Sequence, residues 1–230
     1  MGGARPKQFL EIGGVPLWVH TVRQLLAASL IEAVVLVVPK AEQAETAAAM
    51  AAHDLNGVIG PVAGGATRQE SVRQGILAVP DGFDVIAVHD AARPFPDPER
   101  LDRAIRQAAK GTGVVVGRPA HDTIKRVDDN GRIVDTLDRS TLWQAFTPQV
   151  FPAKMIAAAY DSAHRDGYTG TDDASLVERL GEPVQMLAGG REALKVTTPE
   201  DLETARDWLD RDRSEETSAM TSDSMSESTP

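Results

Sequence analysis

Short apolar runs alternate with stretches of helical periodicity along most of the chain. Six runs have the length and the apolar composition of buried strands: 33–38, 57–62, 85–88, 113–116, 184–187 and 193–196. Helical spacing of apolar residues fills seven other stretches: 16–28, 41–53, 68–79, 98–110, 152–165, 172–180 and 199–209. The repeated order of strand and helix predicts a doubly wound α/β fold with a mostly parallel sheet and flanking helices.

Residues 119–143 break this pattern. Two alternating segments, 123–127 and 132–137, flank Asn130-Gly131, and Asn-Gly in this position is a strong hairpin signal. A two-stranded hairpin is marginally stable on its own. We therefore expect 119–143 to form a β-arm that projects from the sheet and packs on a second subunit.

The composition supports one globular domain followed by a polar tail. The chain has 230 residues, of which 42% are hydrophobic and 25% charged, enough apolar material for a core of ordinary size. Residues 214–230 are rich in Ser, Thr and Glu and contain no aromatic or basic residue. The sequence therefore predicts a domain over 1–211 and a disordered tail over 212–230.

Charge and cysteine content narrow the function classes. The formal net charge of -10 argues against a protein that binds nucleic acids or anionic membranes in general. The absence of cysteine excludes disulfides, thiol catalysis and zinc sites built from cysteine. The N-terminus (MGGARPK) lacks the apolar core of a signal peptide, and no apolar stretch is long enough to span a bilayer, so we expect a cytoplasmic protein.

His89, Asp90 and Arg93 follow directly after the apolar run at 85–88. In open α/β sheets, ligands bind at the carboxyl ends of the strands. Asp90 is therefore placed to bind a metal ion or a hydroxyl group, and Arg93 to bind a phosphate. The alternative is that Asp90 caps the next turn and pairs with Arg93 on the surface.

A pair of glycines precedes the helix predicted at 68–79. Gly64 and Gly65 come just before it, and Ser71 lies in its first turn. Backbone N–H groups at a helix N-terminus favour anions, and glycine lets a ligand approach the backbone closely. A plain turn with a surface serine is the alternative.

Two lysines and a threonine are further candidates. Lys195 sits inside the apolar run 193–196, where an ammonium group needs an anionic partner or a lowered pKa. Lys7 lies before the first helix, where a lysine is ordinarily a solvated charge. Thr171 precedes two acidic residues, a pattern typical of the capped first turn of a helix.

Eight short segments carry a resemblance to a known family. They are 6–10 (PKQFL), 68–72 (RQESV), 88–94 (VHDAARP), 122–125 (DTIK), 138–139 (DR), 147–149 (TPQ), 171–175 (TDDAS) and 195–202 (KVTTPEDL). In this order they resemble the 2-C-methyl-D-erythritol 4-phosphate cytidylyltransferases of the non-mevalonate isoprenoid pathway. The resemblance implies a Rossmann-like nucleotidyltransferase fold, a homodimer interlocked by the β-arm, CTP as co-substrate and Mg²⁺ as cofactor.

The resemblance also implies a role for each matching residue. Lys7 would stabilise charge on the α-phosphate of CTP, and Asp90 would lie near the sugar and bind the metal. Gly65 and Ser71 would lie near the cytosine and its ribose. The residues implied around the methylerythritol phosphate are Arg93, Thr123, Arg139, Thr147, Thr171 and Lys195. Of these, Arg139 and Lys195 are the implied catalytic cations. Arg139 and Thr123 belong to the arm region, so we expect them to serve the site of a partner subunit.

The chain differs from this family at its start. Family members begin with a strand and a loop of the type Ala-Ala-Gly-x-Gly-x-Arg that holds the nucleotide, whereas the match here begins immediately after that arginine. We therefore expect Met1 to be an internal methionine and the chain start to be misplaced or trimmed. A second, milder departure is Ala193-Leu194, where the family usually has Asn-Ile.

The expected reaction is transfer of a cytidylyl group from CTP to 2-C-methyl-D-erythritol 4-phosphate with release of pyrophosphate. Such an in-line transfer needs positioning and cationic charge more than an acid or a base. Two alternatives stand beside it. One is a cytidylyltransferase for another polyol phosphate, such as ribitol 5-phosphate, and the other is a non-catalytic dimeric scaffold that lacks the nucleotide loop.

Overall fold

The computed structural model describes the backbone of residues 10–226 and the side chains of 10–212, so Lys7 lies outside the described residues. The helices are α1 (Leu17–Leu26), α2 (Gln43–Ala52), α3 (Arg68–Leu77), α4 (Pro98–Ala108), α5 (Ala153–Arg165), α6 (Asp173–Arg179) and α7 (Pro199–Ser226). Short 3-10 turns are η2 (Lys40–Glu42), η3 (Arg139–Thr141) and η4 (Arg191–Ala193). The strands are β1 (Glu11–Ile12), β2 (Val15–Pro16), β3 (Val34–Val38), β4 (Val58–Ala63), β5 (Val85–Val88), β6 (Gly113–Pro119), β7 (Lys125–Val127), β8 (Ile133–Thr136), β9 (Trp143–Pro152) and β10 (Val184–Ala188).

The predicted helices are all present, and apart from α7 their ends lie within two residues of the predicted ends. Local capping explains where they begin. The Thr67 hydroxyl accepts the Glu70 N–H at 3.1 Å and the Glu70 carboxylate accepts the Thr67 N–H at 3.2 Å, a capping box that starts α3. In α4, Pro98 follows an Asp97 cap whose carboxylate accepts the Arg100 N–H at 2.9 Å.

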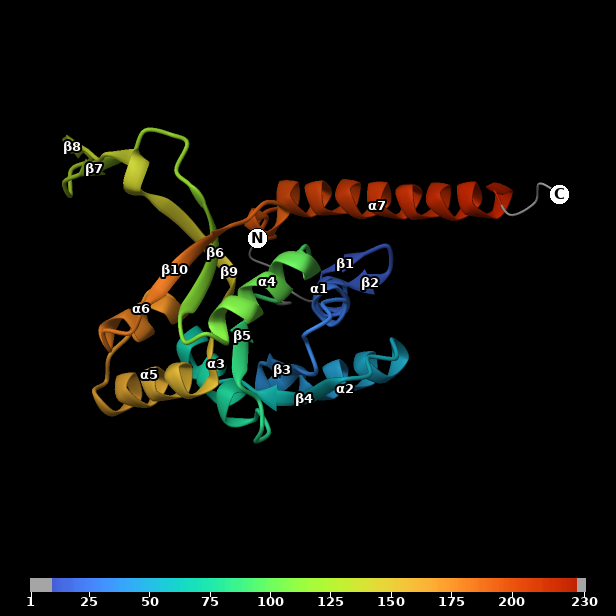
Figure 1. The fold of residues 1–230 in the computed structure, drawn as a ribbon, viewed down its shortest axis with the longest axis horizontal. Helices are drawn as coiled ribbons and strands as arrows, with labels where there is room; N and C mark the ends of the chain where they lie inside the picture. Colours follow the sequence, from blue (N-terminus) through green and yellow to red (C-terminus); the bar gives the residue numbers. More distant parts are fainter. Residues whose placement is uncertain (1–9, 227–230) are drawn as a thin grey trace.

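A four-stranded sheet in the order β10-β6-β9-β5 is flanked by helices (Figure 1). β10 runs parallel to β6, whereas β9 is antiparallel to both β6 and β5. β5, β6 and β10 therefore share one direction, and β9 alone opposes them. β3 and β4 form a separate parallel pair. This arrangement confirms the predicted α/β class with a mostly parallel sheet and flanking helices.

Two differences between the observed and the predicted strands bear on the site. The sequence does not predict β9, because this strand contains Pro148 and Pro152 and proline is depleted in strands. The strand predicted at 193–196 is wrong, since η4 ends at Ala193 and an irregular segment follows. There Val196 N donates to Ala92 O at 2.9 Å, so Lys195 lies on a loop beside the end of β5 rather than within a strand.

β9 is the buried centre of the sheet. Its Phe151 packs against Ile156 of α5 and Leu176 of α6 on one face. The next side chain, Val150, points to the opposite face and packs against Leu101 of α4. Both strand residues are fully buried, so the polar side chains that β9 also carries are held in a rigid layer.

The predicted hairpin is present as β7 and β8, which pair antiparallel and project from the sheet (Figure 1). Gly131 in the turn has a φ of 77°, a conformation that glycine adopts without steric cost. The arm exposes three apolar side chains, Val127, Ile133 and Val134, at 52%, 63% and 62%. Exposed apolar residues of this kind fit a surface that another chain covers, and the dimer stays a prediction.

α7 runs to Ser226, although the sequence predicts a helix end near 209 and a disordered tail over 212–230. No glycine or proline occurs between 200 and 226 to end the helix, which accounts for the longer helical backbone. Its first turns pack Leu209 against the core beside Phe95, and its later turns extend away from the sheet (Figure 1). The domain limit at 211 stays a prediction. Neither α7 nor any other helix in the described part of the chain has both the length and the apolar composition needed to cross a bilayer.

Candidate active site

A cavity of about 880 Å³ is bounded by β3 and β5 together with α1, α3 and α4. Leu36 and Ile86 belong to its apolar wall, whereas Arg68, Asp90 and Lys195 form a polar end. Among the described residues, β3 pairs only with β4 and β5 only with β9, so each strand has one edge without a ladder partner. The volume falls within the usual range of small-molecule sites, so this is the candidate active site.

Both strands direct their carboxyl ends to the polar end of the cavity. Gly64 N, at the start of the loop before α3, donates to Val38 O at the end of β3, at 2.8 Å. Arg68, the first residue of α3, contacts Asp90 just after β5, with Nε and Oδ1 3.1 Å apart. The polar end therefore occupies the usual place for a ligand in an α/β sheet. β5 is less buried than expected, because only Val88 is fully buried and the strand lines the cavity.

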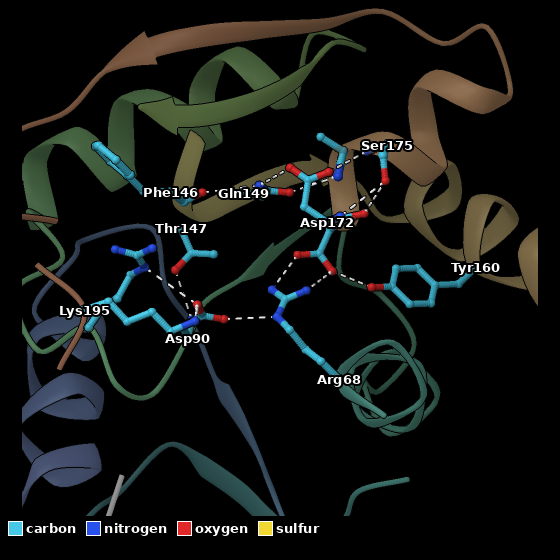
Figure 2. Close-up of polar contacts among 12 residues, drawn as sticks. Arg68, Asp90, Phe146, Thr147, Gln149, Tyr160, Asp172, Ser175 and Lys195 are labelled. Atoms are coloured by element: carbon cyan, nitrogen blue, oxygen red, sulfur yellow. Dashed lines mark hydrogen bonds and ion pairs between the residues drawn. The ribbon is translucent and has the colours of Figure 1, made fainter. Parts of the chain in front are cut away.

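Asp90 is the residue at which three cations meet (Figure 2). Lys195 Nζ donates to its Oδ2 at 2.8 Å, and Arg68 Nε donates to its Oδ1 at 3.1 Å. Arg93 Nε lies 3.6 Å from Oδ2. The anionic partner predicted for Lys195 is therefore Asp90. The alternative pair between Asp90 and Arg93 is present, but it does not lie on the surface, because their side chains are only 15% and 11% exposed.

Burial and the surrounding cations act in opposite directions on Asp90. Burial would raise the pKa of this carboxyl group, but the hydrogen bond from Lys195 and the charges of Lys195 and Arg68 lower it to about 2. Burial lowers the pKa of the neighbouring His89 to about 4. At neutral pH the site thus combines a carboxylate, a neutral imidazole and a surplus of cations, a balance that favours phosphate ligands.

Arg68 joins Asp90 to a second carboxylate, that of Asp173. Its Nη1 and Nη2 donate to Asp173 Oδ1 and Oδ2 at 3.2 and 2.8 Å. Asp173 is fully buried and also accepts a hydrogen bond from the Tyr160 hydroxyl (Figure 2). Burial would lower the pKa of Arg68, but its contacts with Asp173 and Asp90 raise it above the ordinary value. Burial and the charge of Asp173 raise the pKa of Tyr160.

Arg93 holds the loop that carries Lys195. Its Nη1 donates to the carbonyl oxygens of Glu192 and Ala193 at 3.1 and 2.8 Å. Its guanidinium lies 5.5 Å from the ring centroid of Phe146, and burial lowers its pKa. In this structure Arg93 therefore fixes the position of Lys195, and its predicted contact with a phosphate stays a prediction.

The glycine loop before α3 brings Gly65 and Ser71 together beside the cavity. Gly65 N donates to Ser71 Oγ at 3.2 Å, and Ser71 Oγ donates to Thr67 O at 2.9 Å. A Cβ at Gly65 would lie 2.4 Å from the Cβ of Glu70, so the loop admits no side chain there. The N–H groups of Ala66 and Thr67 bind the Glu70 carboxylate at 2.7 and 3.2 Å. Glu70 thus occupies two backbone donors that the sequence suggested for an anion.

Thr147 and Thr171 lie on either side of Gln149. The buried Thr147 hydroxyl accepts the Asp90 N–H at 3.1 Å, which places it against the cation cluster. Gln149 Nε2 donates to Asp172 Oδ2 at 2.9 Å, and its Oε1 accepts a backbone N–H of α6 at 2.9 Å (Figure 2). Thr171 is exposed and precedes Asp172, the cap of α6. Gln149 therefore ties the Thr147 segment of β9 to the Thr171 segment.

The arm residues Thr123 and Arg139 are both exposed. Arg139 Nη1 donates to His121 O at 2.6 Å, which fixes it at the base of the arm. Within the described part of the chain, no hydrogen bond or ion pair joins either residue to Asp90 or Lys195. Their assignment to the site of a partner subunit stays a prediction.

Asp90 is the residue that could hold Mg²⁺. Among the described residues, no group of three or more His, Asp or Glu side chains could hold a metal ion by itself. Mg²⁺ is commonly bound by one or two carboxylates together with substrate phosphates. Asp90 has one partly accessible carboxylate at the polar end of the cavity, so the residues present fit an ion that arrives with a triphosphate.

Sequence reasoning missed Arg68, Gln149 and Asp173 as site residues. Arg68 and Gln149 stand inside two of the segments that carry the family resemblance, RQESV and TPQ, so a signal was present. Asp173 follows a helix cap and resembles an ordinary first-turn acid. Its partner Arg68 lies 105 positions away, and only the tertiary fold reveals the pair.

Comparisons with known proteins agree with this geometry. A family model described as IspD, 2-C-methyl-D-erythritol 4-phosphate cytidylyltransferase, matches residues 1–211. A protein of that name from Syntrophus aciditrophicus is 40% identical over 92% of this chain and 91% of its own length, and one from Symbiobacterium thermophilum is 42% identical over 92% and 88%. The crystal structure of 2-C-methyl-D-erythritol 4-phosphate cytidylyltransferase from Thermus thermophilus is 30% identical, with a TM-score of 0.74 over 90% of this chain and 95% of that one. The structure of 4-diphosphocytidyl-2C-methyl-D-erythritol synthase from Anaerococcus prevotii has a TM-score of 0.79 at 27% identity, over 87% and 88% of the two chains.

Proposed function

The chain belongs to the 2-C-methyl-D-erythritol 4-phosphate cytidylyltransferase family, and from this membership we propose how its residues carry out the family's reaction. The protein is a nucleotidyltransferase that moves a cytidylyl group from CTP to 2-C-methyl-D-erythritol 4-phosphate and releases pyrophosphate, a step of isoprenoid biosynthesis. One observation carries the proposal: Lys195 and Arg68 converge on Asp90 at the polar end of a ligand-sized cavity.

The chemistry suits a site with cations and no obvious base. A phosphate oxygen of the methylerythritol phosphate attacks the α-phosphorus of CTP, and the bond from that phosphorus to the bridging oxygen of pyrophosphate breaks. The attacking oxygen is already anionic, so no proton has to be removed from it. The protein therefore has to hold two highly charged substrates in line and to stabilise the charge that develops on the α-phosphate.

Asp90 and its cations suit the binding of two phosphorylated substrates. Before the substrates bind, Asp90 pairs Lys195 and Arg68 and keeps the like charges of these cations from repelling each other. Lys195 is 42% exposed on its loop, so its ammonium group is free to turn from Asp90 to a phosphate. Arg93 keeps that loop in place through the carbonyl groups that it binds.

The other residues are assigned by their place around this cluster and by the resemblance. Gly65 and Ser71 border the cavity on the α3 side and would face the nucleotide. Thr147, Thr171 and Arg93 would face the acceptor phosphate, with Thr147 in contact with the backbone of Asp90. Lys7, outside the described residues, would stabilise charge on the α-phosphate. Thr123 and Arg139 would complete the acceptor site from the arm.

Mg²⁺ and a second subunit complete the proposal. Asp90 would hold Mg²⁺, which supplies charge neutralisation of the triphosphate when it is bound. The exposed apolar residues of the arm, Val127, Ile133 and Val134, would pack on a second copy of the chain. We further propose that the protein acts in the cytoplasm, because both substrates are small, water-soluble phosphates.

The test is pyrophosphate release from CTP in the presence of Mg²⁺ and either 2-C-methyl-D-erythritol 4-phosphate or ribitol 5-phosphate. We expect release that depends on CTP, on the metal and on the methylerythritol phosphate, with much slower release from UTP or ATP. Faster turnover with ribitol 5-phosphate would assign the protein to another polyol phosphate. Failure to bind CTP at all, in protein shown to be folded, would favour a scaffold over an enzyme.

A further inference from the structure

Arg68 connects Asp90, in the proposed site, to the carboxylate of Asp173. Asp173 is fully buried, yet its carboxylate accepts both terminal nitrogens of Arg68 and the hydroxyl of Tyr160. Each carboxylate oxygen therefore has a donor, and the guanidinium plane is fixed by two parallel bonds. A two-bond grip of this kind determines orientation as well as distance.

Local helix energetics do not explain Arg68. It is the first residue of α3, where the positive end of the helix dipole disfavours a cation. An ion pair with one fully buried partner, such as Arg68 with Asp173, is also weak support for stability, because the desolvation of the buried carboxylate offsets much of the gain from pairing. Arg68 at the N-terminus of α3 and the buried Asp173 are therefore both unfavourable choices for stability. Residues that are unfavourable for stability are expected at functional sites.

The geometry of the guanidinium indicates that function. With Nη1 and Nη2 held by Asp173, the remaining Nε points to Asp90 Oδ1 at 3.1 Å. Lys195 takes the other oxygen, Oδ2, at 2.8 Å. Arg68 thus fixes the orientation of the Asp90 carboxylate. Oδ1 binds Arg68, and Oδ2 faces Lys195 or a ligand that takes the place of Lys195.

We propose that Asp173 and Arg68 are positioning residues that set the orientation of Asp90, with Tyr160 completing the hold on Asp173. The inference rests on the proposed cytidylyltransferase function and adds residues to its site. Neither Asp173 nor Tyr160 has to touch a substrate, because their effect passes through Arg68. Supporting residues behind a site commonly change activity or metal affinity roughly 10- to 100-fold when they are replaced.

Asp173→Asn tests the proposal, because asparagine keeps the size of the side chain but cannot accept both guanidinium nitrogens. We expect kcat to fall roughly 10- to 100-fold while KM for CTP and for the methylerythritol phosphate stays within about threefold. The matched control is Arg73→Gln, which removes another ion pair of α3, with Asp161 at 3.2 Å, away from Asp90. We expect that control to keep the kcat of the original protein.

A double-mutant cycle separates positioning from folding. If Asp173 acts only through Asp90, replacing it in an Asp90→Asn background should lower kcat by less than about twofold more. A merely structural Asp173 would lower the activity of both backgrounds equally, and that result would overturn the proposal. A rise in KM for CTP with unchanged kcat would instead show that Arg68 binds substrate directly.

Two further measurements keep the test decisive. If Asp173→Asn does not fold, Arg68→Lys at the half-exposed end of the pair keeps the charge and loses the two-bond grip, and the same fall in kcat is expected. The second measurement is the affinity for Mn²⁺ in the presence of CTP, determined by electron paramagnetic resonance. It tests the Asp90 site without turnover. We expect it to weaken roughly tenfold in Asp173→Asn and not in Arg73→Gln. Unchanged binding together with unchanged kcat would overturn the proposal, whereas inactivity of the original protein with normal Mn²⁺ binding would count against the proposed function alone.

Discussion

Lys195 Nζ donates to Asp90 Oδ2 at 2.8 Å, although 105 positions separate the two residues. The contact joins a loop near the end of the domain to the end of β5. It also provides the anion that an ammonium group in an apolar stretch requires. Because Asp90 in turn contacts Arg68, the same carboxylate links both sides of the cavity.

Replacing Lys195 or Arg139 should impair turnover without impairing CTP binding. Both are cations assigned to the acceptor phosphate, and charge-assisted bonds to phosphate are strong. In Lys195→Ala and Arg139→Ala we expect pyrophosphate release to fall on the order of a hundredfold or more, with CTP affinity nearly unchanged in calorimetry. Lys154→Ala, an exposed lysine of α5, is the matched control. Equal losses of CTP affinity and turnover would contradict the assignment.

The depressed pKa of Asp90 predicts a loss of stability in acid. In the folded protein the pKa of Asp90 is about 2, below the ordinary value of 3.8. The charged carboxylate therefore stabilises the fold at any pH above about 4. This contribution is lost as pH falls from about 4 to about 2, and a shift of that size corresponds to roughly 2 kcal/mol. The free energies of unfolding of the original protein and of Asp90→Asn should therefore converge over this range. A difference between them that stays constant with pH would show that the cations do not hold Asp90 ionised.

His89 adds a separate acid sensitivity that the comparison with Asp90→Asn largely cancels. Its folded-state pKa of about 4 lies below the ordinary 6.5, so its contribution is present above pH 6.5 and is lost as pH falls toward 4. Both proteins retain His89 and the burial that chiefly lowers its pKa, and they differ only by the smaller effect of the Asp90 charge, which raises the pKa of His89 in the original protein. The remaining difference between them reports Asp90.

The sequence predicts the layers of this protein better than the contacts of its site. Continuous apolar runs such as 33–38 and 85–88 are a strong strand signal, because strands inside a parallel sheet are covered on both faces. β9 escaped because its two prolines suppress that signal, although pairing on both edges makes it a central strand. Lys195 could be singled out because its apolar neighbours made its charge anomalous, even though the strand predicted around it is wrong.

Asp173 could not be singled out in this way. An acid after a helix cap satisfies local rules completely, so nothing in its neighbourhood indicates a distant partner. Arg68 carried a weak anomaly, a cation in the first turn of a helix, but one such residue is common on protein surfaces. The pair acquires meaning only when the fold brings α3 and α6 to the end of β5.

Within the described part of the chain, β3 and β5 each have one edge without a ladder partner, which predicts that an extended segment can fill the apolar part of the cavity and leave its polar end open to ligands. The two strands have five and four residues and direct their carboxyl ends to the same polar end. We expect a family-type segment added before Met1, an apolar strand followed by Ala-Ala-Gly-x-Gly-x-Arg, to pair with these edges and raise the thermal midpoint. Pyrophosphate release should rise about a hundredfold or more, because the loop adds backbone donors and a cation for the triphosphate.

A control segment separates the two effects of that addition. The same strand followed by a Gly-Ser loop without the arginine should raise the thermal midpoint and leave the rate low. If the full segment changes neither the midpoint nor the rate, the cavity is not an acceptor for a strand. Equal turnover with and without the full segment would show that its loop contributes no donors or cation to the triphosphate site.

The exposed arm predicts a symmetric dimer in which Arg139 acts across the interface. Val127, Ile133 and Val134 are exposed on a hairpin that is marginal alone, so burial against a second copy would stabilise it. The test mixes a Lys7→Ala chain with an Arg139→Ala chain, each inactive by itself. If a site takes Lys7 from one chain and Arg139 from the other, every mixed dimer has one intact site. Random exchange at equal concentrations should then restore about one quarter of the original activity. A monomer in light scattering, or no recovery in dimers shown to exchange by mass, would mean that each site is built within one chain.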